Sequence, residues 1–574
     1  MKMKQEIKEL YELWCEKTKG NAELNGELEA IRGKEDEISD RFYRALEFGT
    51  GGLRGVLGAG TNRMNVFTVN QATQGLADFL NSKYESPSVA IAYDSRINSD
   101  VFAKGAAGVL AANGIKVYIY PELVPTPMLS FAIRQLHCKS GIIITASHNP
   151  AKYNGYKCYS PEGYQMTDDD AAKTYEFISK VDIFEDVRTL DFDEGIKEGK
   201  IEYIDKSINE AFYSSVLSRR VNPSAAESGL KVIYTPLNGT GNKPVREVLK
   251  RAGFADVEVV PSQENPDGNF PTCPYPNPEI RQAFEEALKI AQGKEVDLLL
   301  ATDPDCDRVG IAVNTGSDYR LMSGNEVGVL FTEYILSSMK ENGTLPKNPV
   351  IVKSFVTTSL VDRVAQSYGC EIYDVLTGFK YIGEYATDLE KKGESDRFIL
   401  GMEESYGYLS GLHARDKDAV VSSLLVCEMA AYYKAQGKNL AEKMTELYEK
   451  YGYYKNILLN FTFEGESGME KMGAIMTALR NNTPTELCGL KVIESADYKT
   501  SRRVDIVNGT ESEITLPKSN VLAYKLEGGN GFIVRPSGTE PKLKAYVTAC
   551  ASDENSAAAL GEKLSAGIEA LLGV

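Results

Sequence analysis

The sequence predicts an α/β protein with three similar α/β domains, each built on a mixed or parallel sheet, followed by a C-terminal α+β domain. Three observations lead to this prediction. A period of strand and helix recurs three times between residues 89 and 404. Its strands are short and almost wholly apolar, as in sheets that helices cover on both faces. From about residue 456 the period stops, and strands follow one another in pairs.

The three repeats define the order of the expected strands. These lie at residues 89–95, 115–120 and 141–147, then 230–236, 257–261 and 296–303, then 349–355, 370–375 and 398–404. Helical stretches fill the intervals, and right-handed crossovers make each repeat a compact layer. The C-terminal region predicts strands at 456–463, 521–528 and 531–538 and a helix over 553–572.

The length of 574 residues corresponds to about four domains at roughly 150 residues each. We expect boundaries near residues 205, 325 and 455, which gives domains 1–205, 206–325, 326–455 and 456–574. The first 17 residues are charged throughout and predict an amphipathic helix instead of a signal peptide. Residues 419–433 are apolar but too short to span a bilayer, so they predict a buried helix.

Charge and cysteine usage narrow the function class. The formal net charge of −17 argues against general binding of nucleic acid or of anionic membranes, which needs a basic surface. It leaves room for a local basic pocket that binds a small anion. The nine cysteines are scattered without a CxxC pair, which favours a reducing compartment over a disulfide framework or a zinc ribbon. We therefore expect a cytoplasmic protein.

The most polar segments follow the third strand of each repeat. They read SHNP at 147–150, DPDCDR at 303–308 and EESYGY at 403–408. Ligands of open α/β sheets bind beyond the carboxyl ends of the strands. The three segments are therefore expected to form three walls of one central cleft.

Ser147 ends its strand in the sequence TASHNP, where the Asn-Pro turn presents its hydroxyl. The segment suits a nucleophilic or phosphorylated serine, although an ordinary turn at the end of a strand has the same composition. His148 is the next residue in the chain and is expected to be poorly placed as the base of a Ser-His pair. The G-x-S-x-G context of a hydrolase triad is absent.

Asp303, Asp305 and Asp307 alternate along five residues. Alternate residues of an extended segment point the same way, so the three carboxylates would repel one another unless a cation lies between them. Hard oxygen ligands with room for a phosphate oxygen suit Mg²⁺. A solvated acidic turn is the other interpretation, and the glycine and terminal glutamate of an EF-hand loop are missing.

Two further segments suit a sugar phosphate. Glu403 and Ser405 lie in a loop flanked by glycines, where carboxylates and a hydroxyl can bind sugar hydroxyls. Residues 535–541, RPSGTEP, combine an arginine, two hydroxyls and a glycine, which makes a small anion-binding loop. A charged surface loop and a hairpin turn with an incidental arginine are the respective alternatives.

These four segments, in this order and spacing, resemble the α-D-phosphohexomutase superfamily, the family of phosphoglucomutases and phosphomannomutases. The resemblance runs from GTGGLRG at 49–55 to the loop at 535–541, and so covers nearly the whole chain. It implies four domains in a heart-shaped arrangement around a central cleft.

The resemblance also implies roles for individual residues. Ser147 matches the phosphoserine of the family, which also contributes an oxygen to the metal, and the three aspartates match its Mg²⁺ ligands. Contacts to sugar hydroxyls are implied for Glu403 and Ser405. The loop that holds the non-transferring phosphate is matched by Arg535, Ser537, Gly538 and Thr539. Further basic positions of the cleft are Arg54, Lys157, Arg308 and Lys380. Lys157 and His148 are the candidates for proton transfer.

The implied activity is interconversion of glucose 1-phosphate and glucose 6-phosphate through a phosphoserine and glucose 1,6-bisphosphate. The Glu403-Glu404-Ser405 loop is closer to the members that prefer glucose. The segment GTGGLRG at 49–55 and the neighbourhoods 406–408 and 416–418 also resemble a subfamily that contains phosphopentomutases and sugar-bisphosphate synthases. A phosphomannomutase or phosphopentomutase is therefore the close alternative. A non-catalytic sugar-phosphate sensor and a Mg²⁺-dependent phosphatase are more distant ones. The sequence predicts no oligomeric state.

Overall fold

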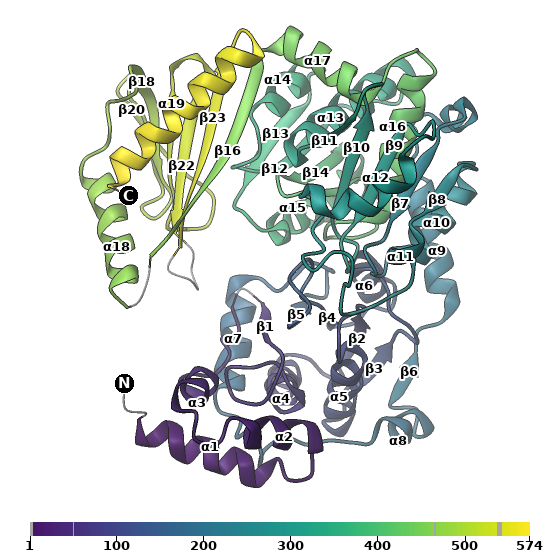
Figure 1. The fold of residues 1–574 in the computed structure, drawn as a ribbon, viewed down its shortest axis with the longest axis vertical. Coiled ribbons are helices and arrows are strands. Elements are labelled where there is room, and N and C mark those ends of the chain that lie inside the picture. The colour runs from purple at the N-terminus through teal and green to yellow at the C-terminus, as the bar shows by residue number, and fades with distance from the viewer. Residues whose placement is uncertain (1–3, 50, 464–465, 537–541, 574) are drawn as a thin grey trace.

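The computed structural model describes residues 4–49, 51–463, 466–536 and 542–573. It contains four sheets in chain order, with six, five, four and eight strands. Figure 1 shows the C-terminal sheet beside the domain that precedes it, and the N-terminal domain below them. The four sheets confirm three α/β domains and a C-terminal domain, while the exact domain boundaries stay predictions.

The first domain begins with three helices, which confirms the amphipathic N-terminal helix. These are α1 (Gln5–Lys17), α2 (Ala22–Ala30) and α3 (Glu35–Phe42). Its strands are β1 (Gly52–Val56), β2 (Ser88–Tyr93), β3 (Lys116–Ile119), β4 (Ser140–Ile144), β5 (Tyr153–Tyr159) and β6 (Ile201–Tyr203). Its other helices are α4 (Val66–Lys83), α5 (Ser99–Ala112), α6 (Thr126–Gln135), α7 (Asp168–Ile178) and α8 (Phe192–Lys197).

The second and third domains repeat this plan. The second contains α9 (Lys206–Leu217), β7 (Val232–Thr235), α10 (Asn242–Arg251), β8 (Val257–Val259), α11 (Pro261–Glu264), α12 (Glu285–Ala291), β9 (Leu298–Thr302), β10 (Val309–Asn314) and β11 (Tyr319–Met322). The third contains α13 (Gly324–Glu341), β12 (Val350–Ser354), α14 (Leu360–Gln366), β13 (Glu371–Val375), α15 (Phe379–Lys391), β14 (Phe398–Glu403), β15 (Gly407–Leu409), α16 (Ala419–Lys434) and α17 (Leu440–Tyr451).

Strand order confirms the threefold repeat. The first three sheets share the orders β3-β2-β4-β5, β8-β7-β9-β10 and β13-β12-β14-β15. In each, three parallel strands are followed by one antiparallel strand, and the polar segment forms the hairpin between the last two. The sequence analysis had not assigned these antiparallel strands. β15 overlaps the polar segment at 403–408, whereas β5 and β10 begin just after the segments at 147–150 and 303–308.

The C-terminal domain has an antiparallel sheet packed against two helices. Its strands are β16 (Tyr453–Thr462), β17 (Glu486–Leu487), β18 (Leu490–Asp497), β19 (Arg502–Asp505), β20 (Thr510–Glu513), β21 (Leu522–Leu526), β22 (Gly531–Pro536) and β23 (Lys542–Ala551). Its helices are α18 (Glu466–Asn481) and α19 (Glu554–Leu572). Side chains of both helices share one apolar core with the sheet.

Helix α16 confirms the predicted buried helix. It is buried around its whole circumference and packs against α9, α10 and β15, which joins the second and third domains. Its one buried carboxylate, Glu428, accepts hydrogen bonds from Arg220, Val221 and Tyr334. Among the described residues, no helix is long and apolar enough to cross a membrane.

Candidate active site

Ser147 lies in the hairpin between β4 and β5. Its φ of 51° is left-handed, so the chain turns sharply as it leaves the buried strand. The Ser147 amide donates to the Thr145 hydroxyl at 2.9 Å, which fixes the turn. The Ser147 hydroxyl donates to Oδ2 of Asp303 at 2.7 Å, across to the second domain. The structure thus brings the serine and the aspartate motif together.

The three aspartates form one buried group between β9 and β10. Their ligand atoms lie within 4.8 Å of one another. Cys306 has a φ of 51°, which turns the chain between the second and third aspartate. Oδ1 of Asp303 accepts the backbone N–H groups of Asp307 and Arg308, both at 3.0 Å. The loop therefore holds its carboxylates together through its own backbone.

The donor set fits a small divalent cation. Oδ1 of Asp305 and Oδ1 of Asp307 are buried and have no hydrogen-bond partner within the described part of the chain. Buried polar atoms are rarely left unpaired unless something else binds them. Carboxylate oxygens are the ligands that Mg²⁺ prefers. The buried aspartates could therefore bind a metal ion of this kind.

Proton affinities within the group diverge because the partners differ. Burial, then Asp305 and Asp307, raise the pKa of Asp303 well above its ordinary value. Burial and Asp305 also raise the pKa of Asp307. Burial opposes ionisation of Asp305 too, but the ammonium of Lys157 outweighs it and lowers the pKa of this carboxyl.

Two lysines face the aspartates. Nζ of Lys157, on β5, lies 3.0 Å from Oδ2 of Asp305. Nζ of Lys417 lies 3.1 Å from Oδ2 of Asp307 and 3.2 Å from Oδ1 of Asp416. Burial opposes the charge of Lys417, but Asp307 and Asp416 raise its pKa. The sequence analysis had not assigned Lys417 to the site; the charged run at 416–418 was its one indication.

His148 is closer to Ser147 than we expected. Its Nδ1 lies 3.2 Å from the serine hydroxyl. The expectation that adjacency places it poorly was wrong, because the left-handed turn at Ser147 folds the two side chains toward each other. Burial, followed by the charges of Arg308 and Arg54, lowers the pKa of His148 well below its ordinary value. The imidazole is therefore neutral at pH 7 and can accept a proton.

The aspartate loop also contacts the loop of the third domain. Nη1 of Arg308 donates to Glu279 at 2.7 Å and to the backbone oxygen of Ser405 at 3.1 Å. Arg308 and Gly407 form a β-bridge. Oε1 of Glu403, which is 9% exposed, accepts the Gly378 amide at 2.8 Å. The polar segment at 303–308 therefore contacts both the segment at 147–150 and the segment at 403–408, as their places at the ends of the strands predicted.

The remaining predicted residues lie on separate elements. Arg54 is on β1 opposite Gly155 of β5, the strand that carries Lys157. Nζ of Lys380 is paired with Oδ1 of Asp168 at 2.6 Å. Arg535 is on β22, beside Lys544 of β23. Burial and then Arg535 lower the pKa of Lys544. The predicted Ser537, Gly538 and Thr539 lie outside the described residues.

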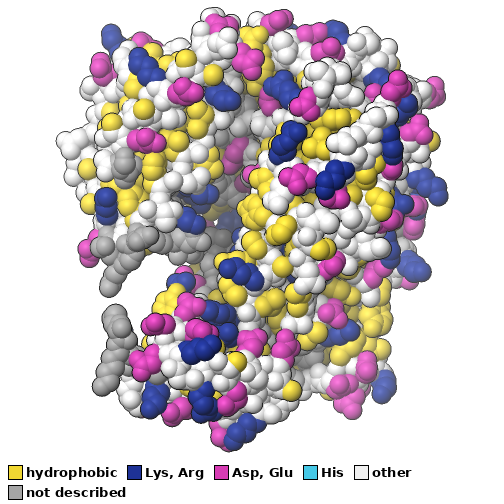
Figure 2. Space-filling model, viewed as in Figure 1, with side chains coloured by type: hydrophobic (Ala, Val, Ile, Leu, Met, Phe, Trp, Pro, Cys, Tyr) yellow, Lys and Arg dark blue, Asp and Glu magenta, His cyan; other side chains and the backbone are white. Residues whose placement is uncertain are grey.

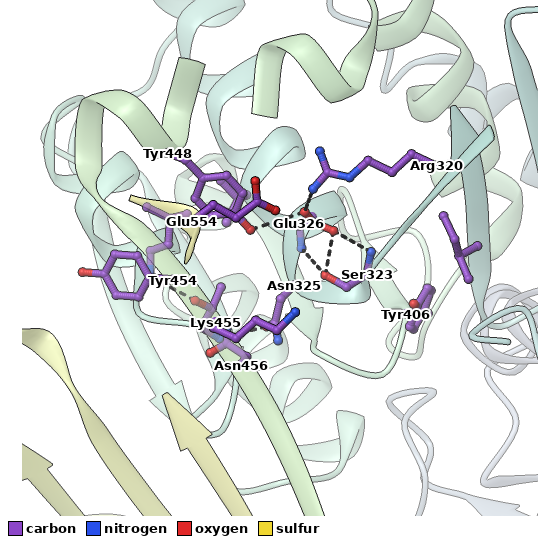
Figure 3. Close-up of a pocket in the computed structure, with 14 residues that line it drawn as sticks. Arg320, Ser323, Asn325, Glu326, Tyr406, Tyr448, Tyr454, Lys455, Asn456 and Glu554 are labelled. Carbon is purple, nitrogen blue, oxygen red and sulfur yellow. Dashed lines mark hydrogen bonds and ion pairs between the residues drawn. The ribbon is translucent and has the colours of Figure 1, made fainter. Parts of the chain in front are cut away.

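Figure 2 shows a hollow on the visible face, between the C-terminal domain and the first domain, with Lys and Arg side chains around it. A separate pocket of about 440 Å³ is lined in part by Tyr406, which belongs to the polar segment at 403–408 (Figure 3). In it, Glu326 accepts hydrogen bonds from Arg320, Ser323 and Tyr448. Of the predicted site residues that the structure describes, none lines this pocket. The central cleft stays a prediction.

Known proteins resemble the chain along nearly its whole length. It matches the phosphoglucomutase/phosphomannomutase family, with alpha/beta/alpha domains I, II and III at residues 45–183, 203–316 and 323–451. The C-terminal domain of the family matches residues 487–561. A phosphoglucomutase of Staphylococcus saprophyticus is 37% identical over 514 residues, which cover 89% of this chain and 92% of that protein.

Two solved structures share the fold. The open form of parafusin, a phosphoglucomutase from Paramecium, has a TM-score of 0.69 at 18% identity, covering 92% of this chain and 96% of that one. N-acetylphosphoglucosamine mutase from Aspergillus fumigatus, solved with GlcNAc-6P and magnesium, has a TM-score of 0.50 at 14% identity, covering 92% and 96%. The family match and the identity to the staphylococcal protein decide the assignment: the chain belongs to the phosphoglucomutase/phosphomannomutase family.

Proposed function

We propose that the protein is a phosphoglucomutase, which interconverts glucose 1-phosphate and glucose 6-phosphate through a phosphoserine at Ser147. The observation that carries the proposal is the 2.7 Å contact between the Ser147 hydroxyl and the buried aspartate group. The staphylococcal relative, named phosphoglucomutase, supports the choice of sugar. The Aspergillus structure, solved with magnesium, supports the choice of metal.

The charge balance explains why the site needs a cation. A phosphoserine carries about −2 and the three aspartates add about −3, so the pocket holds roughly −5. Asp303, Asp305, Asp307 and an oxygen of phospho-Ser147 would hold Mg²⁺, which supplies charge neutralisation to the transferring phosphoryl group. Lys157 and Lys417 already balance part of this charge from the protein side.

The reaction consists of two phosphoryl transfers. In the first, the 6-hydroxyl oxygen of glucose 1-phosphate forms a bond to phosphorus while the bond to Ser147 Oγ breaks. The 6-hydroxyl loses its proton and Ser147 Oγ gains one. The product is glucose 1,6-bisphosphate, which turns within the site. In the second transfer, Ser147 Oγ forms a bond to the phosphorus of the 1-phosphoryl group while the bond from that phosphorus to the sugar O1 breaks. Ser147 Oγ loses its proton, O1 gains one, and glucose 6-phosphate leaves.

We assign proton transfer at Ser147 to His148 and Lys157. When Ser147 is rephosphorylated, its hydroxyl must lose a proton, and Nδ1 of neutral His148 lies 3.2 Å away to accept it. Lys157 is the candidate for the opposite step, in which Ser147 Oγ gains a proton during the first transfer, because its ammonium is a proton donor beside Asp305 in the same group. His148 contacts the Ser147 hydroxyl directly, whereas Lys157 contacts Asp305 and Asp307 of the neighbouring aspartate group.

We assign substrate binding to basic and polar residues of all four domains. Glu403 and Ser405 would bind sugar hydroxyls. The non-transferring phosphate would be held by Arg535, Ser537, Gly538 and Thr539. The cations Arg54, Arg308 and Lys380 would balance the substrate charge of about −2. Glucose 1,6-bisphosphate would also serve as the activator that phosphorylates Ser147. We place the enzyme in the cytoplasm, which the nine free cysteines support.

Phosphate transfer to Ser147 is the direct test. The protein is incubated with glucose 1,6-bisphosphate and Mg²⁺, and peptides are mapped by mass. We expect an adduct of about 80 Da on Ser147. Ser147→Ala should lose both the adduct and turnover, whereas Ser140→Ala, which removes another buried hydroxyl, should keep both. Normal turnover by Ser147→Ala would refute the mechanism.

Sugar choice is tested separately. Turnover of glucose, mannose and ribose 1-phosphates is compared at equal concentration with purified enzyme. We expect glucose 1-phosphate to have the highest kcat/KM. A preference for mannose or ribose 1-phosphate would make the enzyme a phosphomannomutase or phosphopentomutase with the same chemistry. Release of free phosphate without an isomerised sugar phosphate would identify a phosphatase instead.

A further inference from the structure

Arg96 lies just after β2 and binds the turn that carries Ser147. Its Nη1 donates to the backbone oxygens of Pro150 at 3.1 Å and Tyr153 at 3.0 Å. Its Nη2 donates to the backbone oxygens of Ser147 and Asn149. Arg96 is only 3% exposed. One buried guanidinium therefore binds four carbonyl oxygens of the hairpin between Ser147 and Tyr153.

These hydrogen bonds from Arg96 stabilise an unfavourable backbone conformation at Ser147. The left-handed φ of Ser147 persists only where the surroundings impose it. The guanidinium supplies the donors that the buried carbonyls of the turn would otherwise lack. Arg96 is itself fixed, since its own amide donates to Oδ1 of Asp94 at 2.9 Å and its Nε lies 3.4 Å from Oδ2 of the same residue.

A loop of the second domain covers Arg96. The ring of Phe270 lies over the guanidinium, 5.0 Å from ring centroid to Cζ, and Phe270 is fully buried. The loop can approach this closely because residue 268 is glycine. A Cβ atom there would lie 2.6 Å from the Ile97 nitrogen and 2.8 Å from the Ser95 oxygen. The guanidinium is thus bound by the serine turn and covered by the domain that carries the aspartates.

We propose that Arg96 and Phe270 are positioning residues that fix Ser147 against the aspartate group. Neither touches the reacting atoms. Ser147 and Asp303 belong to different domains, so their 2.7 Å contact depends on how the two domains are held together. The Arg96–Phe270 contact joins the serine turn to the second domain directly. The inference rests on the proposed function for its kinetic test, but not for its structural one.

The test uses full-length Arg96→Met, Arg96→Lys and Phe270→Leu. A misplacement of about 1 Å can cost roughly 100-fold in rate. We expect kcat of Arg96→Met to fall about 100-fold with KM for glucose 1-phosphate nearly unchanged, because Arg96 hydrogen-bonds to none of the described residues that we assign to substrate binding. Arg96→Lys should recover part of the loss, and Phe270→Leu should fall about tenfold. Arg134→Met is the matched control, since Arg134 also joins two domains but binds Glu162 and Glu390.

Amide hydrogen exchange tests the positioning role of Arg96 and Phe270 independently of the proposed reaction. In Arg96→Met and Phe270→Leu, amides of residues 147–153 should exchange at least tenfold faster than in the wild type, while Arg134→Met leaves them unchanged. This readout needs no activity, so it holds even if the proposed reaction is wrong. If Arg96→Met fails to fold, Phe270→Leu carries the test. Wild-type exchange and kcat within threefold in a folded variant would overturn the proposal.

Discussion

Asp303, Asp305 and Asp307 carry the same carboxyl group within one buried cluster, yet their neighbours give them different proton affinities. Lys157 keeps Asp305 ionised, whereas burial and like charge favour the protonated form of Asp303. Repulsion inside the cluster therefore opposes folding until a cation enters. This is the local price of a charged site built inside a protein of net charge −17.

Asp303→Asn tests this balance. Asparagine can keep the loop hydrogen bonds at Oδ1 and cannot ionise, so it removes the cost of a buried carboxyl whose ionisation its neighbours oppose. Without Mg²⁺ we expect the variant to melt about 3 °C higher than the wild type, which corresponds to ~1 kcal/mol of relieved repulsion. With Mg²⁺ the order should reverse, because only the wild type gains from tight metal binding. Thermal melts in EDTA and in Mg²⁺ measure both effects, and an equal Mg²⁺ shift in the two proteins would contradict the metal assignment.

Glu404 gives a pH-dependent effect. Burial, and then the charge of Glu403, raise its pKa to about 7. A carboxyl whose pKa is raised on folding stabilises the fold below its ordinary pKa of about 4.5, and this contribution is lost as pH rises through about 7. Glu404→Gln should remove the loss, so its stability relative to the wild type should rise by ~3 kcal/mol between pH 4.5 and pH 8. Melting temperatures of both proteins across this range provide the measurement. A constant difference would show that Glu404 titrates normally.

At the scale of elements, the sequence alone was enough to predict the threefold repeat of strands and helices and the polar motifs at the strand ends. Buried parallel strands have an apolar pattern that local composition reveals, and the polar segments stand out at their ends. The antiparallel strands β5, β10 and β15 were missed because each continues a motif hairpin. The contact of His148 with Ser147 also escaped prediction, since it depends on the sign of one φ angle.

Helix α16 offers a test of what a buried charge contributes. Glu428 is fully buried and accepts hydrogen bonds from Arg220, Val221 and Tyr334. Glu428→Ala leaves the Arg220 charge and the donors unpaired, so we expect a loss of ~3 kcal/mol in stability and a clear fall in melting temperature. Glu449→Ala, on the exposed face of α17, should change stability by less than about 0.5 kcal/mol. Equal melting of the two variants would mean that water replaces the lost partners.

At the scale of the whole molecule, the site depends on contacts between residues far apart in the sequence. Thr126 of the first domain donates to Asp305 at 3.1 Å, and Tyr159 donates to Asp416 of the third at 2.6 Å. Such pairs leave no local pattern, so the sequence predicted which segments meet but not the atoms through which they meet. Lys417 is the clearest case, because only the folded chain brings its ammonium to Asp307.

The pair between Lys380 and Asp168 joins the third domain to the first, and it occupies a cation that we assign to the substrate. Asp168→Asn keeps the shape of the side chain and an oxygen for the Tyr381 hydroxyl, but it frees the ammonium of Lys380. Lys380 is buried but its partner Asp168 is exposed, and an ion pair that water reaches in this way contributes at most about 1 kcal/mol. KM for glucose 1-phosphate should therefore fall about threefold at unchanged kcat. Lys380→Met should raise KM instead, by about tenfold. Steady-state kinetics of both variants shows whether Asp168 competes with the substrate for Lys380 or helps to hold the two domains together. If Asp168→Asn raises KM as Lys380→Met does, the ion pair holds the two domains in their productive arrangement and Asp168 does not compete with the substrate.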